Sequence, residues 1–91
     1  MIFEWDEAKR AANLAKHGVD FEAVRAFDWE TATQSLDRRR NYGEARWRAY
    51  GLIGVRLYVL VFTLRGEQVR IISLRKANVL EVAEYEAQGL S

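Results

Sequence analysis

Apolar residues near the start of the chain recur at the three- and four-residue spacing of a helix. Asp6 is a good N-cap for a helix over residues 7–16, "EAKRAANLAK", and Gly18 is a natural left-handed stop after it. One face of this predicted helix carries a narrow apolar stripe. The stripe consists of Ala8, Ala11, Ala12, Leu14 and Ala15.

A second helix is predicted directly after the first, over "VDFEAVRAF". Asp20 can cap it, and Val19 and Val24 are placed as a hydrophobic staple. Phe21, Val24 and Phe27 share one face at helical spacing, so we expect this face to be buried.

The hydrophobic period changes to two in the middle of the chain, which predicts strands. "TATQSL" is a weak strand candidate, whereas "RWRAYGLIG" alternates clearly between its two faces. "VRLYVLVFTL" is apolar on both faces, as a central strand covered on both sides would be. After a turn at "RGEQ", the strand "VRIISLR" should run antiparallel to it because the link is so short.

The last segment predicts a helix over residues 79–88, "VLEVAEYEAQ", which Gly89 ends. Asn78 and Glu81 have the spacing of an N-cap and its capping-box partner. The chain therefore predicts a single α+β domain over residues 1–91. It should contain two N-terminal helices, an antiparallel three- to four-stranded sheet and a C-terminal helix.

Composition narrows the function classes. No apolar run approaches the roughly 20 residues that cross a bilayer, and the start, "MIFEWDEAKR", is unlike a signal peptide, so we expect a cytoplasmic protein with no membrane contact. With one His and no Cys, a zinc or other soft-metal site is disfavoured. We expect no cofactor.

The net charge of +1 hides a strongly uneven distribution. Residues 1–37 carry four cations against eight carboxylates, and residues 77–91 carry three glutamates and no cation. Residues 38–76 carry ten cations against two carboxylates. A basic centre of this kind attracts polyanions through its local field, although acidic helices could instead neutralise a basic sheet within the fold.

Three separated blocks resemble the BrnT family, in the family's order, from Phe3 to Glu86. They are "FEWDEAKRAANLAKHGVDFEAV", the arginine-bearing strand that ends at Gly51, and "VRIISLRKA" followed by Glu81 and "EYE". The resemblance implies a RelE-like fold and a toxin of a bacterial type II toxin–antitoxin pair that cleaves RNA without a metal and inhibits translation. It also implies a small BrnA-like antitoxin with a ribbon-helix-helix segment, through which the complex contacts its operator DNA.

Cleavage of RNA without a metal needs a base for the 2′-hydroxyl, cations for the phosphorane and an acid for the leaving 5′-oxygen. Arg70 and Arg75 differ by an odd number, so they face opposite sides of one regular strand unless a bulge intervenes. We expect Arg70 to pair with a carboxylate across the sheet. We expect a phosphate-binding cluster at one sheet edge from Arg65, Arg75 and Lys76, with Arg46 as a further strand-borne cation.

The general base has three candidates. His17 is the only imidazole, but its place before Gly18 also suits a helix-end His that interacts with the dipole. Tyr85 could supply a phenol or stack on a base, or simply pack beside a neighbouring residue. Lys76 could act as a base only if desolvation lowered its pKa.

Two function classes remain open. In the first, the chain is a metal-independent endoribonuclease toxin. In the second, it is a non-catalytic module whose basic surface binds an acidic protein or a nucleic-acid backbone. The run Arg38–Arg40 beside Tyr42 fits either class, because it could grip an RNA backbone or be a solvated loop.

Overall fold

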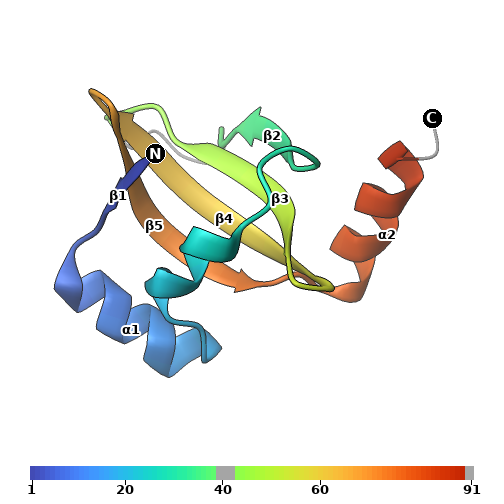
Figure 1. Cartoon of the computed structure of the whole chain (residues 1–91), viewed down its shortest axis with the longest axis horizontal. Helices are drawn as coiled ribbons and strands as arrows, with labels where there is room; N and C mark the ends of the chain where they lie inside the picture. Colours follow the sequence, from blue (N-terminus) through green and yellow to red (C-terminus); the bar gives the residue numbers. More distant parts are fainter. Residues whose placement is uncertain (39–42, 90–91) are drawn as a thin grey trace.

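The computed structural model describes residues 1–38 and 43–89, which form a five-stranded sheet with helical segments packed on it (Figure 1). The strands are β1 (Ile2–Glu4), β2 (Thr33–Leu36), β3 (Trp47–Ile53), β4 (Arg56–Arg65) and β5 (Gln68–Lys76). The helical segments are α1 (Glu7–His17), the 3-10 helix η1 (Phe21–Ala26) and α2 (Val79–Gly89). The strand order is β1-β5-β4-β3-β2, in which only the β1–β5 pair is parallel.

The α+β class and the antiparallel meander from β2 to β5 are confirmed, but the predicted number of strands and helices is wrong. Ile2–Glu4 form a fifth strand, which pairs in parallel with β5. Phe3, for example, is opposite Val69, although the two residues are far apart in the sequence. A parallel, non-local pair has no hairpin signal in the sequence.

The second predicted helix is the 3-10 segment η1 rather than an α-helix. Its buried side chains, Phe21 and Val24, and the buried Phe27 that follows are spaced three residues apart. A 3-10 helix has three residues per turn, so it keeps all three on one line against the sheet. Asp20 caps this segment as predicted, since its carboxylate accepts from the backbone N–H of Glu22 at 3.0 Å.

The central strand β4 is buried on both sides, as its sequence predicts. Leu60 and Phe62 join the main core under η1, and we call their side of the sheet the core face. Leu57 and Val59 alternate with them and join a smaller cluster on the opposite side, to which α2 contributes Val82 and Tyr85. We call that opposite side the α2 face.

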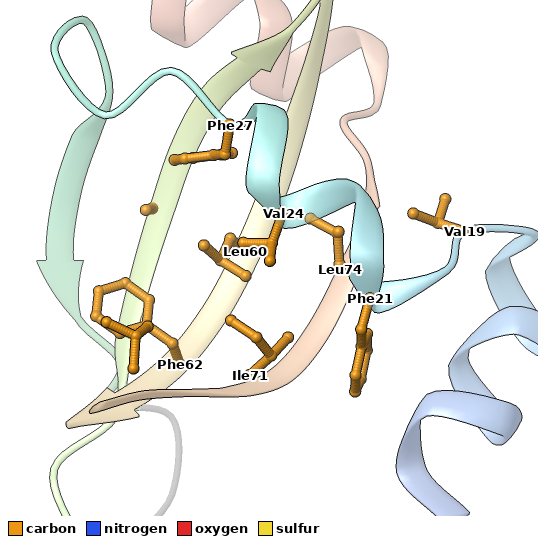
Figure 2. Close-up of a cluster of buried hydrophobic side chains, with 10 residues drawn as sticks. Val19, Phe21, Val24, Phe27, Leu60, Phe62, Ile71 and Leu74 are labelled. Atoms are coloured by element: carbon orange, nitrogen blue, oxygen red, sulfur yellow. The ribbon is translucent and has the colours of Figure 1, made fainter. Parts of the chain in front are cut away.

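The main core is formed where η1 crosses the sheet (Figure 2). Val24 of η1 lies over Leu60 and Leu74, and Phe27 lies beside them. The ring of Phe27 also lies directly over Gly51 of β3, where any Cβ would overlap the ring atom Cζ. This contact explains why position 51 is a glycine, and β3 continues past it to Ile53.

A β-bulge divides β5. Val61 of β4 is opposite Ser73 and Phe62 is opposite Ile71, so Ile72 has no partner on β4. The bulge reverses the alternation of faces along the rest of the strand. Arg70 and Arg75 therefore both lie on the α2 face, instead of on opposite sides as a regular strand would place them.

Asn13 closes the outer edge of β5 beyond the point where β1 stops pairing. Its Nδ2 donates to the carbonyl of Leu74 at 2.8 Å, and its Oδ1 accepts from the N–H of the same residue at 3.2 Å. Nδ2 also donates to the carbonyl of Val19 at 2.9 Å. The buried amide of Asn13 thus makes the two backbone hydrogen bonds that a neighbouring strand would make at Leu74. Its bond to Val19 also fixes the turn that follows α1.

The apolar stripe of α1 does not pack on the core. All five of its residues are exposed, and Asn13 is the one buried residue of the helix. The reason is that α1 docks on a strand edge, where backbone groups require hydrogen-bond partners, and not on an apolar sheet face. The predicted ends of α1 are confirmed: Asp6 accepts from the N–H of Lys9 at 3.0 Å, and Gly18 has a φ of 70°.

We predict that Asn13→Ala lowers the free energy of unfolding by about 2–3 kcal/mol, because it leaves three buried backbone groups without their partners. Urea unfolding measures this loss. Leu14→Ala is the matched control, since Leu14 is adjacent but 41% exposed. Equal midpoints for the two variants would show that Asn13 does not hold α1 on β5.

Candidate functional site

Among the described residues, five arginines lie on the α2 face of the sheet, and we call this surface the arginine face. They are Arg46, directly before β3, Arg48 on β3, Arg65 at the end of β4, and Arg70 and Arg75 on β5. The strand alternation places them on this side, because Trp47 and Ala49 face the main core and the bulge brings Arg75 to the same side as Arg70.

Arg48 is the least compensated cation of the arginine face. Among the described residues it makes no ion pair, and its Nε is buried without a hydrogen-bond partner. One guanidinium nitrogen donates to the hydroxyl of Tyr50 at 3.4 Å, which is a weak contact. A desolvated guanidinium with unused donors is a strong candidate for binding an anion. The alternation of β3 indicated this orientation, but nothing in the sequence ranked Arg48 above the other arginines.

Arg75 is held in place by Glu81 of α2. Two guanidinium nitrogens donate to the two carboxylate oxygens at 2.8 Å each. The same carboxylate accepts from the N–H of Asn78, whose side chain accepts from the N–H of Glu81, both at 2.8 Å, so the predicted capping box is confirmed. The hydrogen bonds from Arg75, helped by Asn78 and by the charges of Arg75 and Arg48, lower the pKa of Glu81 to about 2.

The other three arginines of this face also have carboxylates nearby. Arg70 lies 3.5 Å from Glu4 on the neighbouring strand β1, which confirms the expected cross-sheet ion pair. Glu44 lies 3.9 Å from Arg46 and 3.6 Å from Arg65. The acidic segments of the chain thus neutralise part of the basic sheet, and among the described arginines of the arginine face Arg48 is the one without an ion pair.

The predicted cluster of Arg65, Arg75 and Lys76 is wrong. Arg65 lies at the β4–β5 turn, where it is opposite Gln68. Arg75 is opposite Val59, which precedes Arg65 by six residues on β4. At roughly 3.3 Å per residue, this separates the two arginines by about 20 Å. Lys76 is opposite Tyr58, which packs against the main core, so it lies on the other face from Arg75.

His17 lies in a cleft of about 330 Å³ between α1 and the outer edge of β5. The cleft is lined by Lys9, Ala12, Asn13, Lys16, His17, Ile72 and Ser73. Burial, together with the charges of Lys16 and Arg75, lowers the pKa of His17 below its ordinary value. A lowered pKa favours the neutral form of the imidazole, so His17 is less suited to be a cation at the helix end.

Tyr85 does not meet His17. Its ring packs on the small cluster of the α2 face, and its hydroxyl donates to the carbonyl of Thr31 at 2.8 Å. The phenol therefore already has a structural partner, which favours packing or stacking over proton transfer. Of the predicted basic run, Arg38 is exposed, whereas residues 39–42 lie outside the described part of the chain.

Within residues 1–38 and 43–89, no group of three or more His, Asp or Glu side chains is arranged to hold a metal ion. In the same ranges, no helix is long and apolar enough to span a membrane.

The fold and site together define a small α+β protein with an arginine-rich sheet face and a histidine at the edge of the sheet. The family model described as "Ribonuclease toxin, BrnT, of type II toxin-antitoxin system" matches residues 5–81. The chain therefore belongs to the BrnT family of toxin ribonucleases, as its three sequence blocks predict. No curated protein matches the chain.

We predict that the ion pair between Arg75 and Glu81 makes stability depend on pH. The pKa of Glu81 is about 2 in the folded protein and ordinary, near 4.5, in the unfolded chain, so its contribution is complete above pH 4.5 and is lost as the pH falls toward 2. Urea unfolding across this range should show that the wild type loses its advantage over Glu81→Gln in acid. Glu86→Gln, an exposed change on the same helix, is the control. A constant difference between wild type and Glu81→Gln would contradict this account.

Proposed function

We propose that the chain is an endoribonuclease toxin that cleaves RNA without a metal ion and thereby inhibits translation. The observation that carries the proposal is that Arg48 and Arg75 lie on the same face of the sheet, on the two strands that flank β4, while His17 lies at the outer edge of β5, the strand that carries Arg75. Two guanidinium groups suit a phosphorane, and an imidazole whose pKa is lowered by burial suits proton abstraction.

In the proposed reaction, His17 takes the proton of a ribose 2′-hydroxyl. The 2′-oxygen then forms a bond to the adjacent phosphorus, while Arg48 and Arg75 stabilise the charge on the equatorial oxygens. The bond from phosphorus to the 5′-oxygen breaks, and the leaving oxygen takes a proton from water. The products are a 2′,3′-cyclic phosphate and a 5′-hydroxyl end.

The remaining cations have supporting roles in this proposal. Arg46 and Arg65 lie near Glu44, toward the β4–β5 turn, where they would bind phosphates that flank the cleaved bond. Lys76 is assigned no part in the chemistry, because the strand register directs it to the core face.

The proposed partners are an RNA substrate and a BrnA-like ribbon-helix-helix antitoxin. Operator DNA would be bound only indirectly, through the antitoxin. We place the activity in the cytoplasm, where RNA and the antitoxin are available, and assign it to one domain over residues 1–91.

Expression of the chain alone in bacteria should slow growth and reduce bulk translation, and co-expression of the adjacent antitoxin gene should restore both. Growth curves and incorporation of labelled amino acids measure these effects. Normal growth at confirmed soluble expression would favour the non-catalytic binding module, whose partly neutralised basic face would then serve only to hold a partner.

The site itself is tested in the same assays and with purified protein. Arg48→Ala and His17→Gln should each reduce RNA cleavage by about 10²–10³-fold with little change in melting temperature. Arg75→Ala should lose activity and also melt earlier, because Glu81 is left unpaired. Arg56→Ala, an exposed change at the start of β4, is the control. Full activity in Arg48→Ala would exclude the arginine face as the phosphate site.

Cleavage should persist in excess EDTA and yield 2′,3′-cyclic phosphate or 3′-phosphate ends, because the proposed base and charge-stabilising groups are all side chains. End-group analysis of a labelled RNA, with and without chelator, provides the measurement. Activity that disappears with EDTA and returns with a divalent ion would overturn the mechanism.

A further inference from the structure

A second pocket, of about 240 Å³, lies between β2 and α2 at the edge of the arginine face. It is lined by Thr33, Gln34, Ser35, Tyr50, Glu84, Tyr85 and Gln88. None of these residues takes part in the proposed reaction. We propose that this pocket binds a guanine base of the RNA next to the cleaved phosphate and so gives the toxin a sequence preference. The inference rests on the proposed function and adds a base-specific subsite to it.

Two tyrosines provide aromatic surface on which a base can stack. Tyr50 stands on β3 and Tyr85 on α2, and both pack partly on the cluster of Leu57, Val59 and Ala77. The hydrogen bond from the Tyr85 hydroxyl to Thr31 fixes that ring further. Unstacked bases of single-stranded RNA bind to such fixed aromatic rings, at about 1–3 kcal/mol per base.

The polar lining can read the edge of the base. Glu84 supplies a carboxylate with two acceptor oxygens, and Gln34 and Gln88 supply amides. Guanine presents two adjacent donors on its Watson–Crick edge, the N1–H and the N2 amino group, which match the two carboxylate oxygens. Adenine, cytosine and uracil lack this pair of adjacent donors, so the carboxylate selects guanine.

The position of the pocket connects it to the phosphate site. Tyr50 lines the pocket and accepts a hydrogen bond from Arg48 at 3.4 Å. In the strand register, Tyr50 is opposite Val59, which is opposite Arg75 on the next strand. Two strand spacings amount to about 10 Å, which a nucleotide can bridge with its base in the pocket and its phosphate between the two arginines.

The α2 helix holds both parts of this arrangement. Glu81, near its start, fixes Arg75, and Tyr85 lies one turn further along the helix. The helix therefore links Arg75 to one wall of the base pocket, whereas the sheet register places Arg48 and Tyr50.

The test uses short single-stranded RNAs that differ only in one central base, which is G, A, C or U. We expect wild-type protein to cleave next to G about tenfold faster than next to the other bases. Glu84→Gln should lose that preference while cleavage next to A, C and U changes little. Because the preference is a ratio within one protein preparation, partial unfolding cannot produce or remove it. Glu86→Gln, on the same helix but outside the pocket, should keep the wild-type preference.

A binding assay separates the pocket from the chemistry. Non-cleavable 2′-O-methyl versions of the same RNAs should bind to the wild type with a preference for G that Glu84→Gln abolishes. Cleavage without any base preference, or a preference for G that Glu84→Gln retains, would overturn the inference and leave the proposed function intact. A G preference in binding with no cleavage of any RNA would support the pocket and refute the nuclease proposal. Equal binding of all four RNAs would likewise overturn the inference.

Discussion

The amide of Asn13 holds together the part of the fold on which the site depends. β1 pairs with only the first residues of β5, so the rest of that outer edge would otherwise have unpaired backbone groups. Asn13 provides the missing donor and acceptor at Leu74 and also binds the carbonyl of Val19. One side chain therefore joins α1, β5 and the turn into η1. His17 lies four residues after Asn13 on the same helix face, so the contact that docks the helix also brings the imidazole to the strand that carries Arg75.

The bulge at Ile72 is the second constraint, and it links core packing to charge placement. Val69, Ile71 and Leu74 all face the core, but the first two are an even number of residues apart and the last two an odd number. Side chains of a regular strand alternate between its two faces, so a regular strand could not direct all three into the core. The extra residue allows all three to be buried and turns Arg70 and Arg75 to the same side. The arginine face is thus a consequence of how the core of β5 is filled.

The arginine face balances its own charge. Arginines packed side by side on a sheet repel one another, and burial raises the cost of each charge. Glu4, Glu44 and Glu81 reduce this cost from three different segments of the chain. Arg75 is oriented by Glu81 with both carboxylate oxygens engaged, whereas the Nε of Arg48 has no hydrogen-bond partner. The acidic segments therefore neutralise much of the basic centre within the fold, as one of the two interpretations of the charge distribution expects.

The sequence by itself determined the features that depend on neighbouring residues. Asp6, Gly18, Asp20 and the capping box of Asn78 with Glu81 act over a few positions, and each is in its predicted place. The alternation of β3 and the doubly apolar run of β4 likewise gave the antiparallel meander, and the three sequence blocks gave the family.

Only the tertiary structure decided the parallel β1–β5 pair, the bulge, the docking of α1 by a polar residue and the separation of Arg65 and Lys76 from Arg75. It also singled out Arg48, which looks like any other strand arginine in the sequence. These features have a common physical reason. Strand register and helix docking satisfy backbone hydrogen bonds and core volume between segments far apart in the chain, and neither requirement is expressed in the order of neighbouring residues.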